Sequence, residues 1–368
     1  MSDMEYIEPY IINKIKYAEY NSTLGKVTGY TETGVRNAEE WNKDTAALQA
    51  RKANVERYCK GNAQLYNTAI FSKTVEPVVK VKMVQKSEGS HVDNLMCSAY
   101  SFYPPHIKVT WMRNGKEVKA DVTSTEEMPD GDWYYQIHSH LQYKPESGEE
   151  ISCVVEHASF KKPMIYKWDP SMPESDKSKI AIGASGLVLG IIISAAGFIY
   201  YKKKHSESFD FPGGYEHSVS EQEICKNNLD VAVKAYKNPP EALDVPQNSI
   251  YSKSNVELGA QNTLICHSAR FFPPPVRIHW TRNGEDVTES STLSQFYPNE
   301  DNTYNQFSHL PFTPQQGDVY SCTVEHKALQ IPDTMTWGPA VFCGVGLAVG
   351  LLGVATGTFF LVKGNQCN

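Results

Sequence analysis

The feature that most constrains the fold of this chain is an internal duplication, in which matched positions are separated by 169 residues. The clearest matches are CVVEH at 153–157 with CTVEH at 322–326, FYPP at 102–105 with FFPP at 271–274, and WMRNG at 111–115 with WTRNG at 280–284. The alignment needs no insertion over more than 70 residues. The chain therefore contains two copies of one domain.

Within each copy, a tryptophan lies between two cysteines that are 56 positions apart: Cys97, Trp111 and Cys153 in the first copy, and Cys266, Trp280 and Cys322 in the second. This arrangement is typical of two β-sheets that pack face to face and are joined by a disulfide against a buried tryptophan. The alternating residues of VKVKM at 79–83 predict a strand, and RNG predicts a turn. We therefore expect two immunoglobulin-type sandwiches, each with its own disulfide, formed in an oxidising compartment.

Two long apolar segments, 180–201 and 340–362, contain no charged residue. Each is long enough to cross a hydrocarbon core of about 30 Å as a helix, because a helix rises about 1.5 Å per residue. Small residues, which let two membrane helices approach closely, line one face of each segment: Gly186 and Gly190 in the first, and Gly346, Gly350, Gly353 and Gly357 in the second. We predict two membrane helices that pair through these faces. The alternative is that glycine is simply frequent in membrane helices.

The sequence contains none of the signatures of the common enzyme sites. HExxH, GxSxG and phosphate-loop motifs are absent, and the glycine-rich GVGLAVG at 344–350 lies within a predicted membrane helix. Cys153 and His157 have a spacing that could serve zinc, but no second pair completes a tetrahedral set. The net charge of −7 does not favour nucleic acid as a partner. We expect no enzymatic activity, no metal and no cofactor.

The segments that precede the two sandwiches are of a different kind. Residues 4–30 predict strands in which Tyr6, Glu8 and Tyr10 lie on one face, and residues 37–62 predict a long polar helix with a thin apolar stripe. A helix this polar is not expected to be buried. In the second half, one face of a predicted helix ahead of Pro239 and Pro240 carries these residues: Tyr215, Val219, Gln222, Cys225, Leu229, Ala232 and Tyr236.

CxVEH, FYPP and WxRNG together resemble the membrane-proximal domains of major histocompatibility complex class II chains. Residues 4–204 resemble a truncated β chain, joined to residues 207–368, which resemble a truncated α chain. The resemblance implies α+β segments of a partial peptide-binding groove, two all-β immunoglobulin C1-type sandwiches and two single transmembrane helices. The implied division is a partial groove domain at 1–75, an immunoglobulin-like domain at 76–168, a connecting peptide at 169–179, a membrane helix at 180–201, a tail or junction at 202–206, a partial groove helix at 207–240, an immunoglobulin-like domain at 241–337, a membrane helix at 340–362 and a tail at 363–368.

The resemblance also implies residues for peptide binding. Trp41, Asn62 and Asn228 match an indole and two asparagines that hydrogen-bond the peptide backbone, and the candidates for side-chain pockets on the sheet are Tyr6, Glu8, Tyr10 and Tyr17. The alternative for Trp41 and Tyr10 is ordinary packing. Departures from the family pattern are Gly61 in place of a histidine, Asn37 and Ala235 in place of an acid–arginine pair, and Ile151 where the second copy has Tyr320.

The implied function is antigen presentation without catalysis, in which peptides from endocytosed antigens are displayed to T-cell receptors of helper T cells. Implied partners are the peptide antigens, the T-cell receptor and the helper co-receptor, an invariant-chain-type chaperone, the α/β heterodimer partner and membrane lipid. The implied cellular locations are the cell membrane, endosomal and lysosomal membranes, and the endoplasmic reticulum during assembly. Each half is implied to be a single-pass type I membrane protein. The alternatives are a non-classical peptide-editing protein and an immunoglobulin-type adhesion or signalling receptor.

The order of segments along the chain creates a conflict of topology. Lys202 to Lys204 place the end of the first span in the cytosol, and the second sandwich, which needs an oxidising compartment, follows on the same side. We therefore hypothesise that two neighbouring coding units, each truncated at its front, are joined here. The cysteines left without an expected partner are Cys59, Cys225, Cys343 and Cys367, the last a candidate for palmitoylation. Asn21, in Asn-Ser-Thr, is the one acceptor sequence for N-glycosylation.

Overall fold

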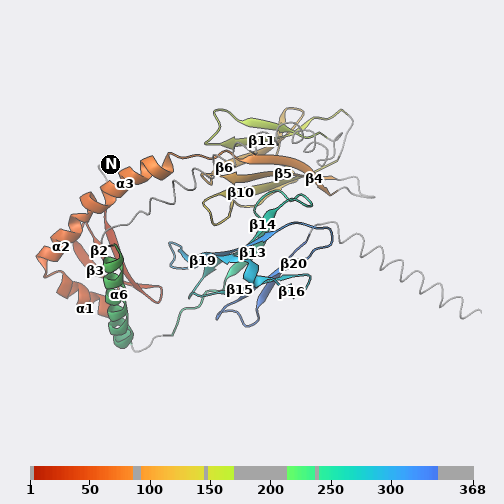
Figure 1. The fold of residues 1–368 in the computed structure, drawn as a ribbon. Coiled ribbons are helices and arrows are strands. Elements are labelled where there is room, and N and C mark those ends of the chain that lie inside the picture. The colour runs from red at the N-terminus through yellow and green to blue at the C-terminus, as the bar shows by residue number, and fades with distance from the viewer. Residues whose placement is uncertain (1–3, 86–92, 145–147, 170–213, 237–239, 339–368) are drawn as a thin grey trace, which may run out of the picture.

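The computed structural model describes residues 4–85, 93–144, 148–169, 214–236 and 240–338. Along the chain these form a small sheet with helices, a first sandwich, the helix α6 (Gly214–Tyr236) and a second sandwich (Figure 1). The predicted membrane helices at 180–201 and 340–362, with their glycine faces, lie outside the described residues. Among the helices within those residues, none combines the length and apolar character needed to cross a membrane.

The N-terminal part is a three-stranded antiparallel sheet followed by a chain of helices. The strands, in spatial order, are β1 (Ile7–Ile12), β2 (Ile15–Asn21) and β3 (Lys26–Gly29). The helices are α1 (Glu32–Trp41), α2 (Thr45–Lys52), the π-helix η1 (Val55–Lys60), α3 (Gly61–Tyr66) and the π-helix η2 (Asn67–Phe71). Ala18, Tyr20, Val27 and Ala38 form the buried centre between sheet and helix. Gly34 allows this contact, because a Cβ atom there would lie 1.7 Å from the carbonyl oxygen of Tyr17.

The polar helix expected over 37–62 differs from the structure, because the helical run begins earlier, ends later and is interrupted after Trp41. The side-chain amide of Asn42 accepts a hydrogen bond from the backbone N–H of Val27 at 2.7 Å and donates one to its carbonyl at 2.8 Å. This pairing with β3 draws the chain away from the helical path. Asp44 then caps α2 by accepting from the N–H of Ala47 at 2.9 Å, as a residue at a helix N-cap does.

The first sandwich consists of two antiparallel sheets. One has the order β4-β5-β10-β8, with β9 also paired to β10, and the other has the order β12-β11-β6-β7. The strands are β4 (Val78–Gln85), β5 (Asp93–Phe102), β6 (Ile107–Arg113), β7 (Lys116–Val118), β8 (Val122–Ser124), β9 (Met128–Pro129), β10 (Tyr135–Tyr143), β11 (Ile151–His157) and β12 (Met164–Lys167).

The second sandwich repeats this topology. Its sheets have the orders β13-β14-β19-β17, with β18 paired to β19, and β16-β15-β20-β21. The elements are β13 (Gln247–Ser252), β14 (Asn262–Phe271), β15 (Arg277–Arg282), β16 (Glu285–Asp286), the 3-10 helix η3 (Thr288–Ser290), β17 (Thr292–Leu293), β18 (Tyr297–Pro298), β19 (Tyr304–Phe312), β20 (Tyr320–Glu325) and β21 (Asp333–Trp337).

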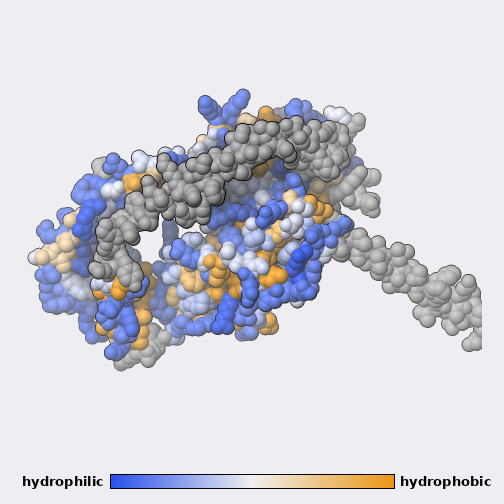
Figure 2. All heavy atoms as spheres, in the orientation of Figure 1, coloured by the Kyte–Doolittle hydropathy of each residue, from blue (hydrophilic) through white to orange (hydrophobic). Residues whose placement is uncertain are grey.

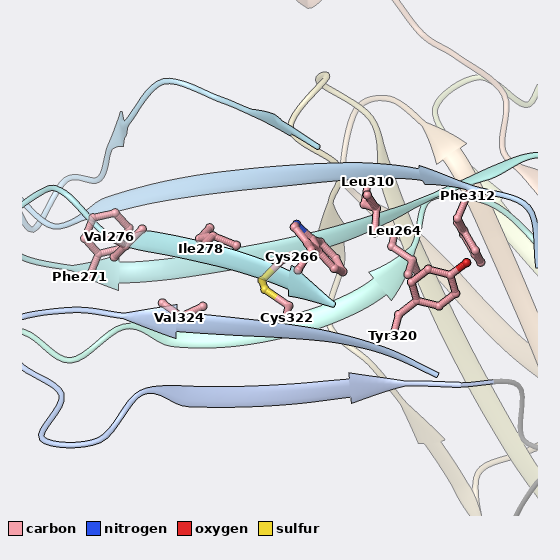
Figure 3. Packing of buried hydrophobic residues seen from close by; sticks show 11 residues of the cluster. Leu264, Cys266, Phe271, Val276, Ile278, Leu310, Phe312, Tyr320, Cys322 and Val324 are labelled. Carbon is pink, nitrogen blue, oxygen red and sulfur yellow. A yellow bond between two sulfur atoms is a disulfide. The ribbon is translucent and has the colours of Figure 1, made fainter. Parts of the chain in front are cut away.

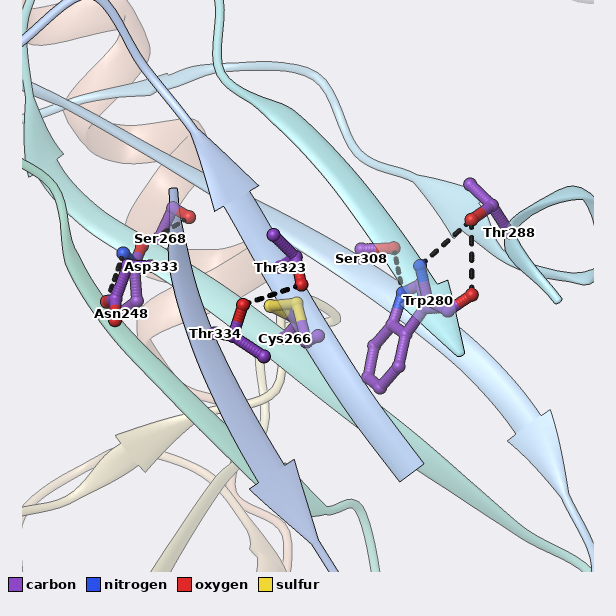
Figure 4. Close-up of a disulfide and its surroundings, with 10 residues drawn as sticks. Asn248, Cys266, Ser268, Trp280, Thr288, Ser308, Thr323, Asp333 and Thr334 are labelled. Atoms are coloured by element: carbon purple, nitrogen blue, oxygen red, sulfur yellow. Dashed lines mark hydrogen bonds between the residues drawn. A yellow bond between two sulfur atoms is a disulfide. The ribbon is translucent and has the colours of Figure 1, made fainter. Parts of the chain in front are cut away.

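Each sandwich has a disulfide at its centre, Cys97 to Cys153 in the first and Cys266 to Cys322 in the second. In the second copy, the bond lies in a buried cluster that includes Leu264, Val324 and, further along the sandwich, Phe312 (Figure 3). Trp280 is fully buried, and its indole N–H donates to Ser308 Oγ at 2.9 Å (Figure 4). Trp111 and Ser139 make the matching bond at 3.1 Å in the first copy, so the duplication preserves the polar contacts of the core as well as its apolar residues.

The two copies differ at one corner. In the second, Arg282 donates to Asp318 at 2.8 Å, and the hydroxyl of Tyr320 donates to the same carboxylate at 3.4 Å. In the first, Arg113 pairs with Glu149, while Ile151 stands where the second copy has Tyr320 and is buried. The corner hydrogen bond of the tyrosine is therefore made in one copy only, as its sequence predicts.

Helix α6 agrees with the predicted second-half helix in position, but it buries no apolar stripe. Its described side chains are exposed, apart from the half-buried Ala232. Figure 2 shows hydrophobic residues at the surface in this region. They are Val219, Ile224, Leu229, Val231 and Val233.

Candidate functional site

The surface of the N-terminal sheet that faces the helices is lined by tyrosine and glutamate. Along β1 the exposure alternates, so that Glu8 and Tyr10 are half-buried beneath the helices, as is Tyr6 just before the strand. Ile7 and Ile11 point to the opposite face and are 47% and 39% exposed. The alternation is the one expected from the period of two in a strand. Polar side chains therefore occupy the face on which the helices lie.

These side chains form one hydrogen-bonded cluster. The hydroxyl of Tyr6 donates to Glu8 Oε2 at 2.8 Å, and the hydroxyl of Tyr10 donates to Glu8 Oε1. Arg51, which extends from α2, donates to the Tyr10 oxygen at 3.2 Å and has its Nε 3.6 Å from Glu8 Oε1. The carboxylate thus lies among two hydroxyl donors and one cation. We refer to Tyr6, Glu8, Tyr10 and Arg51 as the floor cluster.

The environment of the floor cluster keeps its tyrosines protonated. Burial, followed by the hydrogen bond and charge of Glu8, raises the pKa of Tyr10 to about 12. The pKa of Tyr6 is raised for the same reasons, with burial again the largest. Burial lowers the pKa of Arg51, but its hydrogen bonds and the charges of Tyr10 and Glu8 outweigh this and raise it overall. The tyrosines remain hydrogen-bond donors and Arg51 remains a cation at any physiological pH.

An aromatic row continues the floor cluster toward the end of α1. The rings of Tyr10 and Trp41 have centroids 4.8 Å apart, and those of Tyr10 and Tyr17 are 6.1 Å apart. Trp41 is only half-buried. Trp41 therefore packs on Tyr10, as the packing alternative holds, but it also keeps an exposed part that a ligand could contact.

The two asparagines lie on different helices. Asn62 is in the first turn of α3 and is half-exposed, while Asn228 is exposed on α6. Among the described residues, neither side-chain amide has a hydrogen-bond partner. Both are free to bind a ligand, but no contact between described residues brings them together. Cys59 and Cys225 are both free thiols, half-buried and exposed respectively.

A second polar region, which sequence reasoning missed, lies where the two sandwiches meet. The hydroxyl of Tyr251 donates to the carbonyl of Pro129 at 2.5 Å, His309 Nε2 donates to the carbonyl of Asp130 at 2.6 Å, and Gln136 Nε2 donates to the carbonyl of Ser252 at 3.0 Å. The sheet of β5 and β10 therefore faces the sheet of β13 and β19, as Figure 1 also shows. In all three contacts, a side chain from a strand of one copy donates to a backbone carbonyl of the other copy.

Two half-buried histidines lie on β10 and β14, in the two sheets that face each other. Burial lowers the pKa of His138 to about 4, and it lowers the pKa of His267 to about 4 as well. His138 is 2.7 Å from Ser98 Oγ through Nδ1, and His267 stacks on Phe307 with ring centroids 4.3 Å apart. The sequence signal that could have indicated a covered sheet face is histidine on β10 and β14 at positions that point away from the core.

Comparisons with known proteins follow the same division. Residues 1–67 match the family model described as class II histocompatibility antigen, beta domain. Residues 79–160 and 249–329 each match the immunoglobulin C1-set domain.

Three curated proteins illustrate the similarity. The human class II histocompatibility antigen DR beta 4 chain is 38% identical over 206 residues, which cover 56% of this chain and 77% of that protein. The dog DR-1 beta chain is 36% identical over 212 residues, which cover 57% of this chain and 79% of that protein. The mouse E-D beta chain is 34% identical over 212 residues, which cover 57% of this chain and 80% of that protein.

Proposed function

We propose a function from one premise: the chain belongs to the class II histocompatibility antigen family, with β-chain homology over about half of its length. It would bind peptides from endocytosed antigens and display them to the receptors of helper T cells. Proteins of this family are not enzymes, and the chain is not one either. The observation that carries the proposal is the floor cluster, a row of hydrogen-bonding side chains between a sheet and a helix with accessible polar groups beside it.

Peptides of many sequences can be held only through what they share, which is their backbone. An extended peptide has N–H and C=O groups that must be satisfied when it leaves water. We propose that the Trp41 indole and the Asn62 and Asn228 amides serve these groups. Gly61, which precedes Asn62, has no side chain to add another donor, and we expect weaker retention of the peptide at that point.

The side chains of the peptide would be selected on the sheet. Tyr6, Glu8, Tyr10 and Tyr17 present three hydroxyls and one carboxylate, and Arg51 offsets the charge of that carboxylate. A pocket of this composition favours polar or aromatic anchors, because the hydroxyl groups can bond a polar side chain and the rings can stack on a flat one.

We further propose that the second half is an α-type partner for the first. Support comes from its C1-set domain, from the helix α6 ahead of that domain, and from the hydrogen bonds between the two sandwiches. The proposed domain boundaries and the pairing of membrane helices through their glycines are those predicted from the sequence. At the cell surface and in endosomes, the partners would be a T-cell receptor, the helper co-receptor, an invariant-chain-type chaperone and membrane lipid.

Whether the two halves form one polypeptide can be tested on a reducing denaturing gel. One antibody is directed against residues 110–130 and another against residues 280–300. Two separate bands, each well below 41.2 kDa apart from glycan, are expected if α-type and β-type chains are made separately. One shared band near 41.2 kDa would refute that separation.

Peptide binding is tested by acid elution from the purified full chain. A mixture of peptides is expected, and an empty eluate would favour the adhesion receptor or the peptide-editing protein. Asn62→Ala should weaken retention about fivefold, because one hydrogen bond to the peptide backbone is lost. Gln64→Ala, at an exposed position of the same helix, is the matched control and should elute as the unmodified chain does.

A further inference from the structure

The turn between β1 and β2 has a backbone conformation that is unfavourable for one of its two central residues. Ile12 and Ile15 are paired directly, so Asn13 and Lys14 form a two-residue turn, and their φ angles are 48° and 65°. Positive φ at both central positions is the conformation for which Asn-Gly is strongly preferred. Asparagine suits the first position, but lysine at the second is more strained than glycine would be. A side chain at position 14 therefore strains the backbone, and no contact within the turn offsets this strain.

Both side chains of the turn contact the second half of the chain. Asn13 Nδ2 donates to the carbonyl of Pro240 at 2.7 Å, and its Oδ1 accepts from the N–H of Ala242 at 2.8 Å. The Asn13 amide thus pairs with one C=O and one N–H of the same backbone segment, which is how the backbone of a neighbouring β-strand would pair with it. Lys14 Nζ forms an ion pair with Asp244 and lies 5.9 Å from the centroid of the Phe272 ring.

The contacted segment is itself attached to the second sandwich. The N–H of Asp244 donates to the carbonyl of Phe272 at 2.9 Å, and the N–H of Phe272 donates back to Asp244 at 3.3 Å. Asp244 and Phe272 are therefore presented to Lys14 as one unit, a carboxylate beside an aromatic ring. The contact is separate from the one between the two sandwiches, which uses residues of β9, β10, β13 and β19.

We infer that the Asn13–Lys14 turn is a docking element, with which the sheet of the first half recognises the segment 240–244 of the second. Asn13 binds only backbone groups, so its contact does not depend on the side chains of the partner segment. The contact of Lys14 does depend on them, because it needs an acidic side chain beside an aromatic ring. The recognised partner is an extended segment that enters an immunoglobulin-type sandwich and carries an aspartate at this point. The inference rests on the proposed function, since it supplies a contact through which an α-type half would be matched to a β-type half.

Hydrogen exchange of backbone amides in the full chain tests this inference without any peptide. Asn13→Ala removes the acceptor of the Ala242 N–H, and we expect exchange there to accelerate about fivefold. Lys14→Asp and Asp244→Lys should each accelerate exchange of the backbone amides of residues 241–244, and the double variant should restore the original rate because the ion pair is rebuilt in reverse. Single variants without effect, or a double variant that exchanges as fast as the single ones, would overturn the inference.

Two further variants separate docking from folding of the hairpin. Lys14→Gly relieves the unfavourable φ, so the N–H groups of β1 and β2 should stay protected while the amides of residues 241–244 lose protection. Lys16→Asp is the control, because this lysine pairs with Glu19 of its own strand at 2.6 Å. It should leave the exchange rates of residues 241–244 unchanged. An empty peptide eluate would contradict the proposed function but not these exchange rates, so the two failures are distinguishable.

Discussion

His326 donates a hydrogen bond from Nε2 to the carbonyl oxygen of Pro273 at 2.7 Å, and this bond connects the end of β20 to the turn after β14. His157 and Pro104 make the same bond at 2.9 Å in the first sandwich. Each imidazole also meets a phenylalanine ring edge-on, Phe271 in one copy and Phe102 in the other. The histidine that ends CTVEH and CVVEH is therefore a structural link to FFPP and FYPP, which explains why these motifs recur together.

Replacement of this histidine should destabilise its sandwich. His326→Ala leaves a half-buried carbonyl without its donor and should lower the free energy of unfolding by about 1–3 kcal/mol. Urea denaturation followed by tryptophan fluorescence measures the loss. His279→Ala is the control, because that side chain is 50% exposed and should change stability by no more than about 0.5 kcal/mol. Equal losses in the two variants would contradict the role given to His326.

Removal of the Asn42 side chain should loosen the helices from the sheet. Asn42→Ala breaks both bonds to Val27 and leaves buried backbone groups of β3 unpaired, so we expect a loss of about 1–3 kcal/mol. Lys43→Ala removes only an exposed ion pair with Glu40 and should cost less than about 1 kcal/mol. Thermal unfolding by circular dichroism would compare the two, and a larger loss for Lys43→Ala would refute the explanation of the helix break.

Acid should destabilise the two sandwiches. An unfolded histidine has a pKa of about 6.5, whereas burial lowers the pKa of both His138 and His267 to about 4 in the folded chain. Between these values the unfolded state binds more protons, so stability is lost as the pH falls from about 6.5 to about 4, by up to about 1.4 kcal/mol per pH unit for each histidine.

The groups around these histidines do not reverse the effect. Lys82 and His140 also lower the pKa of His138, and a hydrogen bond with Asn305 only partly opposes burial at His267. Melting temperatures measured from pH 7 to pH 4 should fall less steeply in His138→Gln and His267→Gln. The exposed His106→Gln should follow the unmodified chain, and identical slopes in all variants would argue against this assignment.

Arg51 should influence which peptides are retained. Without it, Glu8 keeps its two hydroxyl donors but loses its cation, so a basic anchor in the peptide would be favoured over an uncharged one. Arg51→Ala should therefore enrich lysine and arginine in the eluted peptides at one fixed position. Lys52→Ala, next to it on α2 and exposed, should leave the composition unchanged, and so a matching shift in both variants would rule out a specific role for Arg51.

The sandwiches could be predicted from sequence because their determinants are short-range or strongly patterned. The spacing of Cys97, Trp111 and Cys153 and the alternation within strands describe a core whose geometry is common to many sequences. The strands at 4–30 and the helix ahead of Pro239 follow from periodicity in the same way. The side-chain partners within the N-terminal part did not follow, since Arg51 meets Tyr10 from 41 positions away.

What the sequence by itself determined is therefore the two disulfide-linked cores, the strands at 4–30, the helix ahead of Pro239 and the family. What only the tertiary structure decided is where the separate parts meet: Asn42 on β3, the sandwich contact through Tyr251, and the Asn13–Lys14 turn on residues 240–244. Periodicity reports which face of an element is covered, because apolar burial acts on every residue of that face. It does not report what covers it, because a hydrogen bond between residues more than 220 positions apart leaves no local pattern in either segment.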